Sequence, residues 1–205
     1  MKVCLDLHDF SVAYNRLDVL MRLKDHFPDF KVSLFTIPME SKADWGPYLT
    51  RSESLRQITK NLDWIQIIPH GLRHEGSEMR YCSYYEFKDR ILPTIQEALA
   101  NDGLPYIHGF CAPHWRWSDG VIRVLNEMGW WGAIDRRQPY MLRTKRFYRY
   151  SHCIDEKLPQ EAEVLKLHGH VYGTTNDLER CLDNIFGLTK LVEWHFVTDF
   201  IEENP

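Results

Sequence analysis

The sequence predicts an α/β fold in which alternating strands and helices build a mainly parallel sheet or barrel. Short apolar or β-branched runs alternate with segments whose apolar residues recur at helical spacing. These helical segments are about 10 to 18 residues long, which is typical of βα units. No repeat or low-complexity segment interrupts the pattern, so we expect a single catalytic-size domain over residues 1–205.

The expected strands are the apolar runs at 2–7, 30–37, 64–68, 106–112, 130–134, 146–153, 162–168 and 191–197. The expected helices are 15–26, 52–62, 84–101, 118–128 and 177–186, with a short terminal helix opened by Thr198. Ser118 and Gly129 mark the start and end of one helix, and Pro93 is expected to kink or split another. Asn176 and Glu179 stand at capping-box spacing and predict the start of the helix at 177–186.

Composition excludes several classes of protein. The net charge is −4 with acids and bases interspersed, so there is no basic footprint for nucleic acid. There is no apolar run long enough to span a membrane, and the charged opening strand leaves no room for a secretory leader, so we expect a cytoplasmic protein. The five cysteines form no Cys-x-x-Cys pair, which favours reduced thiols over disulfides or a thiolate zinc site. Composition gives no oligomeric state.

Polar side chains collect where the expected strands end, and this is where α/β folds carry their functional groups. Five strand ends carry them: Asp6, His8 and Asp9; His70 and His74; Cys111, His114 and Trp115; Asp135; and His168 and His170.

The stretch "IIPHGLRHEG" places His70 and His74 four residues apart, directly after a buried strand. Two neutral imidazoles and one carboxylate form a common ligand set for a divalent metal that keeps open positions for water and substrate. Asp9 is the carboxylate that we expect to join them. A pair of surface histidines is the alternative, and the polar residues at the other strand ends favour the metal site.

Asp6 and His8 should share one face of the first strand, whereas Asp9 should point to the other unless the chain turns there. Asp6 is expected either to take part in catalysis or to be a buried carboxylate that bonds a histidine or a loop amide. His8 could be a general base, a group that supports a ligand, or a third imidazole ligand. His168 is either a core histidine or a general acid.

In "CAPHW", Pro113 fixes the loop after a strand and aims Trp115, with His114 between them. The indole could wall an acyl pocket, and a backbone amide at this turn could stabilise an oxyanion. A packed aromatic corner is the alternative. Asp135 is expected either to orient a catalytic histidine or to cap the next turn.

Taken in order, these motifs resemble those of the polysaccharide deacetylase family (the NodB-type domain, carbohydrate esterase family four), and more closely its divergent "HD" branch. "CLDLHDF" stands where that family has an aspartate pair, and "IIPHGLRHEG" resembles its HG-x-x-H metal motif. "GFCAPHW" resembles its arginine-x-proline motif, and "LKLH" its Leu-x-Leu-His motif. The match covers nearly the whole chain.

The resemblance implies a distorted (β/α) barrel of about seven parallel strands. It also implies one divalent metal ion, expected to be zinc with cobalt, nickel or iron as options, held by Asp9, His70 and His74. By analogy, a metal-bound water attacks an acetamide, a backbone amide near Trp115 helps to hold the oxyanion, and His168 protonates the leaving amine.

The chain departs from the family at two positions. His8 stands where the family has its aspartate base, and Cys111 replaces the arginine that pairs with that base. A histidine base needs no guanidinium counter-ion, so the two changes are mutually consistent. They leave open whether His8 or Asp6 is the base.

Three functions follow from these observations. The leading one is a metal-dependent deacetylase acting on an acetylated amino sugar or a related small glycoconjugate. The second is a catalytically silent sugar-binding module on the same barrel. The third is another metal-dependent amidohydrolase, such as a deformylase.

Overall fold

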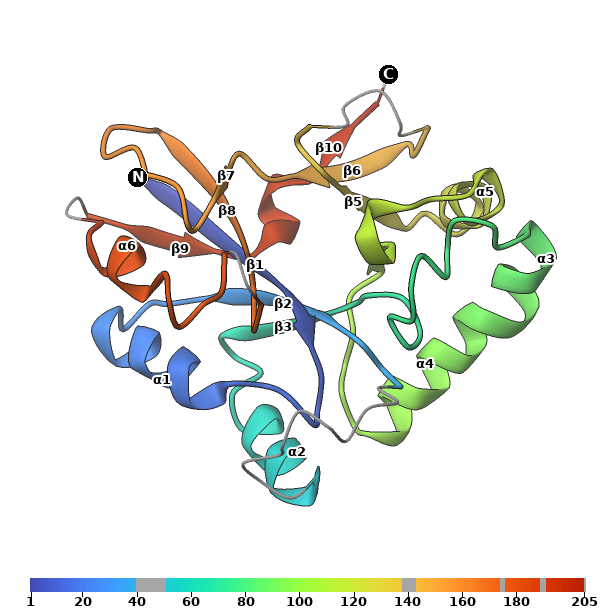
Figure 1. The fold of residues 1–205 in the computed structure, drawn as a ribbon, viewed down its shortest axis with the longest axis horizontal. Coiled ribbons are helices and arrows are strands. Elements are labelled where there is room, and N and C mark those ends of the chain that lie inside the picture. Colours follow the sequence, from blue (N-terminus) through green and yellow to red (C-terminus); the bar gives the residue numbers. More distant parts are fainter. Residues whose placement is uncertain (40–50, 138–142, 174–175, 189–190, 205) are drawn as a thin grey trace.

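The strands lie in two sheets that share one molecule-wide curve (Figure 1). A computed structural model of the chain describes residues 1–39, 51–137, 143–173, 176–188 and 191–204. The first sheet has the order β3-β2-β1-β8-β7, with β9 also paired to β1, and the second has the order β10-β6-β5-β4. The strands of the first sheet are β1 (Lys2–Phe10), β2 (Val32–Thr36), β3 (Ile65–Pro69), β7 (His152–Cys153), β8 (Val164–His170) and β9 (Glu193–His195). Those of the second are β4 (Gly109–Phe110), β5 (Trp131–Ile134), β6 (Arg146–Arg149) and β10 (Glu202–Glu203).

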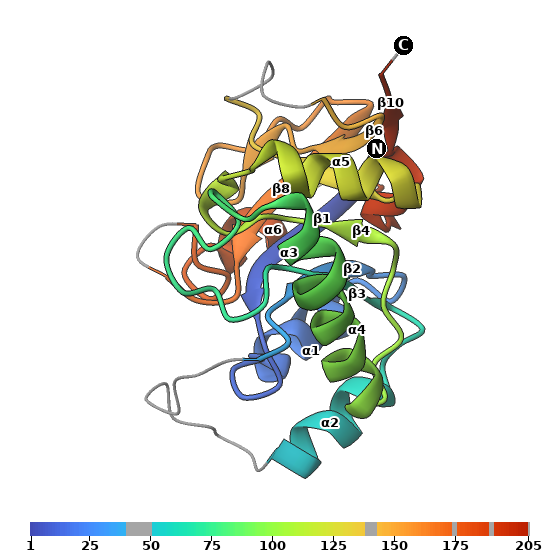
Figure 2. The same ribbon diagram turned by 90° about the vertical axis from the view of Figure 1, so that its right-hand side faces the viewer.

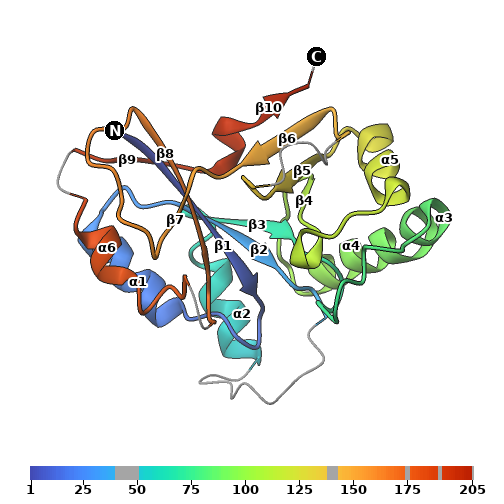
Figure 3. The same ribbon diagram turned by 45° about the horizontal axis from the view of Figure 1, so that its top comes forward.

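Helices surround the strands. They are α1 (Leu17–His26), α2 (Arg51–Thr59), α3 (Tyr84–Glu86), α4 (Leu92–Asn101), α5 (Asp119–Met128) and α6 (Leu182–Phe186), with a π-helical segment (Phe87–Ile91) and 3-10 turns at Pro113–Trp115 and Val197–Phe200. Helices α1 and α6 lie on one side of the molecule, and α3, α4 and α5 on the other (Figures 1 and 3). None of the helices in the described part of the chain is long and apolar enough to cross a membrane.

The prediction of a mainly parallel α/β fold is confirmed. Among the described residues every strand pair is parallel except β6 with β10. Two isolated parallel bridges, Ile67 to Tyr106 and His70 to Cys111, connect the end of the first sheet to the segment around β4. The strands outnumber the seven expected because several are only two or three residues long.

Two predicted helix boundaries are confirmed. The Ser118 hydroxyl accepts a hydrogen bond from the amide of Val121 at the start of α5, and Gly129 closes that helix with φ 70°. Pro93 does divide the predicted 84–101 helix, which continues as α3, a π-helical turn and α4 in one line (Figure 2). Proline has no amide hydrogen to donate, and just before it the backbone widens so that the Leu92 amide bonds Phe87, five residues back.

Two predictions near the carboxyl end are wrong. The helix expected at 177–186 begins only at Leu182, and Asn176 does not cap it, because the segment after Asn176 pairs with the end of β8. Thr198 lies in a single 3-10 turn rather than at the start of a helix, and the chain then forms β10 against β6. In both places pairing with a distant strand overrides the local helical pattern.

Strand β1 lies at the centre of the first sheet and positions the polar residues. Its parallel register with β8 sets Asp6 opposite His168 and His8 opposite His170. Side chains of directly paired residues lie on the same face, so both pairs face the same way. The carboxyl ends of β1, β3 and β8 gather at one edge of the sheet (Figure 3), where the candidate site lies.

Candidate metal centre

The three predicted metal ligands converge. The Asp9 Oδ1 atom lies 3.4 Å from the His70 Nε2 atom and 3.2 Å from the His74 Nε2 atom. One ligand atom from each residue lies within 4.8 Å of the other two. We refer to these residues as the metal cluster. They occupy the floor of an open cleft of about 580 Å³, which is lined by His8, Asp9, His70, His74, Ser77, His114, Trp115, Arg116 and His170.

A bulge in β1 turns Asp9 into this cleft. The register with β2 shifts between Leu7 and Phe10, and Asp9 takes the left-handed φ of 60°. Regular alternation would place His8 and Asp9 on opposite faces, but the bulge lets both line the cleft. The backbone strain at Asp9 is of the kind that concentrates at functional sites.

His70 is held by the backbone beside the residue that replaces the family's arginine. It is 2% exposed, and its Nδ1 atom lies 3.1 Å from the carbonyl oxygen of Cys111. Donation from Nδ1 to that carbonyl leaves Nε2 as the lone-pair nitrogen that faces Asp9 and His74, which is the arrangement seen in metal-binding histidines. The Cys111 thiol is fully buried, and burial raises its pKa well above the ordinary value.

The loop that carries His74 is organised by Glu78. The Glu78 carboxylate accepts hydrogen bonds from the backbone amides of Leu72 at 2.7 Å, Arg73 at 3.3 Å and His74 at 3.2 Å. Gly71 has φ +66°, and a Cβ there would meet the Glu78 carboxylate and the Pro113 ring. Burial lowers the pKa of His74 to about 4, so the imidazole is neutral near pH 7.

The residues present fit a divalent cation. Asp9 Oδ1 and His8 Nε2 are buried polar atoms without a hydrogen-bond partner among the described residues, and a buried orphan normally has an unmodified reason such as an ion. Burial alone would raise the pKa of Asp9, but the nearby His70 and His74 outweigh it and hold that pKa below its ordinary value. Neutral imidazoles and an ionised carboxylate are the forms that bind metal.

Two other groups contain metal-ligating atoms at similar spacing, and both fit less well. The set of His8, His70 and Cys111 would need a thiolate, which burial disfavours. In the set of Asp6, His8 and His168, the carboxylate is already bonded to His168. The metal cluster fits best because all three of its members line the cleft.

Asp6, His168 and Tyr148 form a second group, which we call the buried triad. The His168 Nδ1 atom lies 2.6 Å from Asp6 Oδ1, and the Tyr148 hydroxyl donates to Asp6 Oδ2 at 3.0 Å. Asp6 is 1% exposed and His168 is 3% exposed. Burial raises the pKa of Tyr148 well above its ordinary value, which keeps the phenol a donor. Asp6 therefore holds His168, rather than His8, at hydrogen-bond distance.

His8 lies between the two groups. Its ring centroid is 4.6 Å from that of His70, 4.6 Å from that of His168 and 4.8 Å from that of Trp115. Its Nε2 atom lies 3.4 Å from Asp6 Oδ1. Burial, followed by the surrounding imidazoles, lowers the pKa of His8 well below its ordinary value and favours a neutral ring.

The turn at 113–115 differs in part from the expectation. The Trp115 amide, predicted to face an oxyanion, donates to the Ala112 carbonyl at 2.9 Å and is therefore engaged within the turn. Both His114 and Trp115 have positive φ, which aims the Trp115 ring over His8 and His168. Pro113 is buried, whereas His114 is exposed and lies with its ring centroid 5.0 Å from that of His74.

Asp135 caps a turn, as one of its two predicted roles required. Its Oδ1 atom accepts from the Arg137 amide at 2.8 Å and from the Tyr150 hydroxyl at 2.9 Å. It reaches His168 only indirectly, since the Tyr150 ring stacks on His168 with centroids 4.5 Å apart.

His170 was ranked below His168 from the sequence, yet it lines the cleft while His168 does not. The His170 Nδ1 atom lies 2.7 Å from the side-chain oxygen of Asn176, which fixes the ring with Nε2 free. Burial lowers the pKa of His170. The sequence signal was available, because a strand residue two positions after His168 shares its face.

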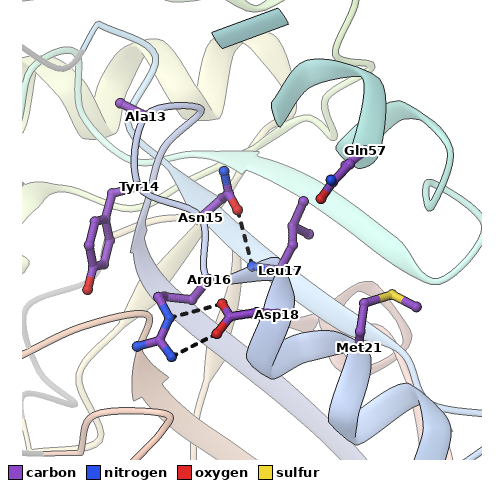
Figure 4. Close-up of a pocket in the computed structure, with 8 residues that line it drawn as sticks. All are labelled: Ala13, Tyr14, Asn15, Arg16, Leu17, Asp18, Met21 and Gln57. Atoms are coloured by element: carbon purple, nitrogen blue, oxygen red, sulfur yellow. Dashed lines mark hydrogen bonds and ion pairs between the residues drawn. The ribbon is translucent and has the colours of Figure 1, made fainter. Parts of the chain in front are cut away.

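A second hollow of about 340 Å³ lies beside α1 and carries no such chemistry (Figure 4). Its one guanidinium, that of Arg16, is bonded to Asp18 at 3.0 Å and to Glu179 at 2.7 Å. The charged groups of this hollow therefore satisfy one another, and we place the functional site in the histidine-lined cleft.

No protein-family model and no curated protein sequence matches the chain. Among solved structures the chain is similar to BA3943 from Bacillus anthracis, a CE4 family pseudoenzyme, at 15% identity over 97% of this chain and 64% of that chain, with a TM-score of 0.60. It is similar to the T48 deacetylase with substrate, at 12% identity over 99% of this chain and 93% of that one, with a TM-score of 0.61. It is also similar to a family 4 acetyl xylan esterase from Clostridium thermocellum in complex with a cobalt ion, at 12% identity over 97% and 89% of the two chains, with a TM-score of 0.54.

These likenesses show the fold. The predicted resemblance to the NodB-like fold of the CE4 polysaccharide deacetylases is therefore confirmed. The chain spans less than two thirds of the length of BA3943. Because one fold can carry active and inactive proteins, function has to be argued from the site.

Proposed function

We propose that the chain is a metal-dependent hydrolase that removes an acetyl group from an amino sugar or a related small glycoconjugate. The observation that carries the proposal is the convergence of Asp9 Oδ1, His70 Nε2 and His74 Nε2 on the floor of an open cleft. The fold is that of deacetylases and esterases that remove acetyl groups, which supports the reaction class. We treat residues 1–205 as one catalytic domain.

Asp9, His70 and His74 would hold one divalent ion. Zinc is our first choice, and cobalt, nickel and iron suit the same mixture of imidazole and carboxylate donors. When bound, such an ion supplies a Lewis acid for the acyl carbonyl and lowers the pKa of a water molecule. Since the Trp115 amide is engaged, we assign no oxyanion role to it.

His8 is our choice for the general base. Its neutral ring lines the cleft beside Asp9, and it accepts a proton from the water that adds to the acyl carbon. Asp6 is a positioning residue in this scheme, because its carboxylate bonds His168 at 2.6 Å.

His168 is our choice for the general acid. As the carbon–nitrogen bond breaks, it donates a proton to the leaving nitrogen, giving acetate and the free amine. Its ring lies behind Trp115 and outside the cleft lining, so the Trp115 indole has to turn aside for the amine to reach it.

Acetate release from acetylated amino sugars tests the proposal. The metal-loaded wild type should turn over such a substrate, His74→Ala should lose both metal and activity, and His168→Gln should keep metal and lose most turnover. His108→Gln is a matched control, because His108 is exposed and lies outside the cleft. Full metal content in His74→Ala would show that the site is wrong.

A silent sugar-binding module is the second candidate. It is favoured by His8 and Cys111 in place of the family's acid–arginine pair, and by the likeness to a pseudoenzyme. Binding of acetylated sugars without acetate release would favour this module. Release of formate from N-formyl substrates, with none from acetylated ones, would instead favour a deformylase.

A further inference from the structure

The cleft around the metal cluster has an unusual balance of ionisable groups. Its lining contains five imidazoles and one guanidinium, that of Arg116, but a single carboxylate, that of Asp9. With neutral imidazoles the two formal charges cancel. A divalent cation bound by the metal cluster then leaves two positive charges uncompensated, which attracts anions into the cleft.

Arg116 is the group at the rim that is free to meet such an anion. It is exposed, and it forms no ion pair or side-chain hydrogen bond with any other residue in the described part of the chain. Many other arginines of the molecule are paired with carboxylates, as Arg136 is with Glu156 and Arg123 with Glu127. A guanidinium is the side chain best shaped to bind carboxylate or phosphate oxygens in pairs.

The turn that carries Arg116 holds it next to the cleft. The Arg116 amide donates to the Pro113 carbonyl at 3.1 Å, and the buried Pro113 packs against Gly71 of the His70 loop. His114, on the same turn, lies beside His74 with ring centroids 5.0 Å apart. The rim and the metal cluster are therefore connected through one packed turn.

We propose that the substrate is an acylated amino compound that carries an anionic group, carboxylate or phosphate, bound at the rim by Arg116 while the acyl amide lies at the metal cluster. This inference rests on the proposed hydrolysis for its reacting end. It restricts the substrate to anionic compounds, and it makes Arg116 a specificity-determining residue rather than a catalytic one.

The test compares an N-acetylated hexosamine with the same sugar phosphorylated on its C6 hydroxyl, and with one bearing a carboxylate on an ether substituent. The metal-loaded wild type should favour at least one anionic sugar. Arg116→Gln should lower kcat/KM for that sugar by about 10–100-fold, mainly through KM, and change that for the neutral sugar by less than about twofold. Arg116→Lys should recover part of the loss, and added salt should reduce the wild-type preference.

Arg56→Gln is the matched control, because Arg56 is an exposed arginine of α2 outside the cleft lining. A wild type without preference for any anionic sugar, or an Arg116→Gln variant that weakens neutral and anionic sugars equally, would overturn the inference. Calorimetric binding of the phosphorylated sugar separates it from the proposed function. Arg116-dependent binding without acetate release would support the anion site and reject the hydrolase, whereas turnover of the neutral sugar alone would do the reverse.

Discussion

The metal cluster and the buried triad lie on either side of His8, and they are built in different ways. The metal cluster is made from irregular backbone: a bulge at Asp9 and a loop in which His74 has φ 57°. The buried triad is made from regular strands, with Asp6 and His168 paired in register between β1 and β8. The first leaves donor atoms open to a cleft, and the second satisfies its donors internally. This difference suits one group to bind an ion and the other to orient an imidazole.

The largest expected effect concerns protonation of the metal cluster. Burial lowers the pKa of His74 to about 4, so protons compete with a metal ion only at low pH. The direction is that a lowered imidazole pKa extends metal binding toward acid. We expect metal content to be constant from about pH 8 to about pH 5.5 and to fall below that. Release centred near pH 6.5, measured by dialysis and elemental analysis, would contradict the burial argument.

Asp6→Asn tests the buried triad. The amide cannot provide the negative charge that holds His168, so turnover should fall by about 10–100-fold while metal content stays unchanged. Asp135→Asn is the control, since Asp135 reaches His168 only through Tyr150, and it should cost no more than about threefold. An equal loss in both variants, or loss of metal in Asp6→Asn, would remove the distinction between the two groups.

Glu78→Gln sharpens the account of the metal cluster. The carboxylate that binds three loop amides becomes neutral, so the loop should hold His74 less firmly and the metal Kd should rise by about 10-fold. Glu97→Gln, an exposed substitution on α4, should leave the Kd unchanged. An unaltered Kd in Glu78→Gln would show that the loop needs no such anchor.

The smallest effect is expected at Tyr150, which stacks on His168. Tyr150→Leu should reduce turnover by about 2–10-fold, because an aromatic contact of this kind contributes about 0.5–1.5 kcal/mol. Tyr150→Phe keeps the ring and should stay close to wild type. A larger loss in Tyr150→Phe than in Tyr150→Leu would assign the effect to the hydroxyl on Asp135 instead.

The sequence was most informative where the chemistry is local. The metal ligands could be predicted because His70 and His74 belong to one short loop, and α5 because Ser118 and Gly129 mark its ends. The pairing of Asp6 with His168 could not, since it depends on the register of strands that are 162 residues apart. The same reason explains the failure at Asn176, whose local helix signal lost to pairing with β8.

The central claim is that Asp9, His70 and His74 bind one metal ion. The most direct test is elemental analysis of the purified wild type, His70→Ala and the control His108→Ala, before and after incubation with Zn²⁺, Co²⁺ or Ni²⁺. We predict about one metal ion per chain in the wild type and the control, and its loss in His70→Ala. No metal in any of the three proteins, or an undiminished content in His70→Ala, would contradict the claim.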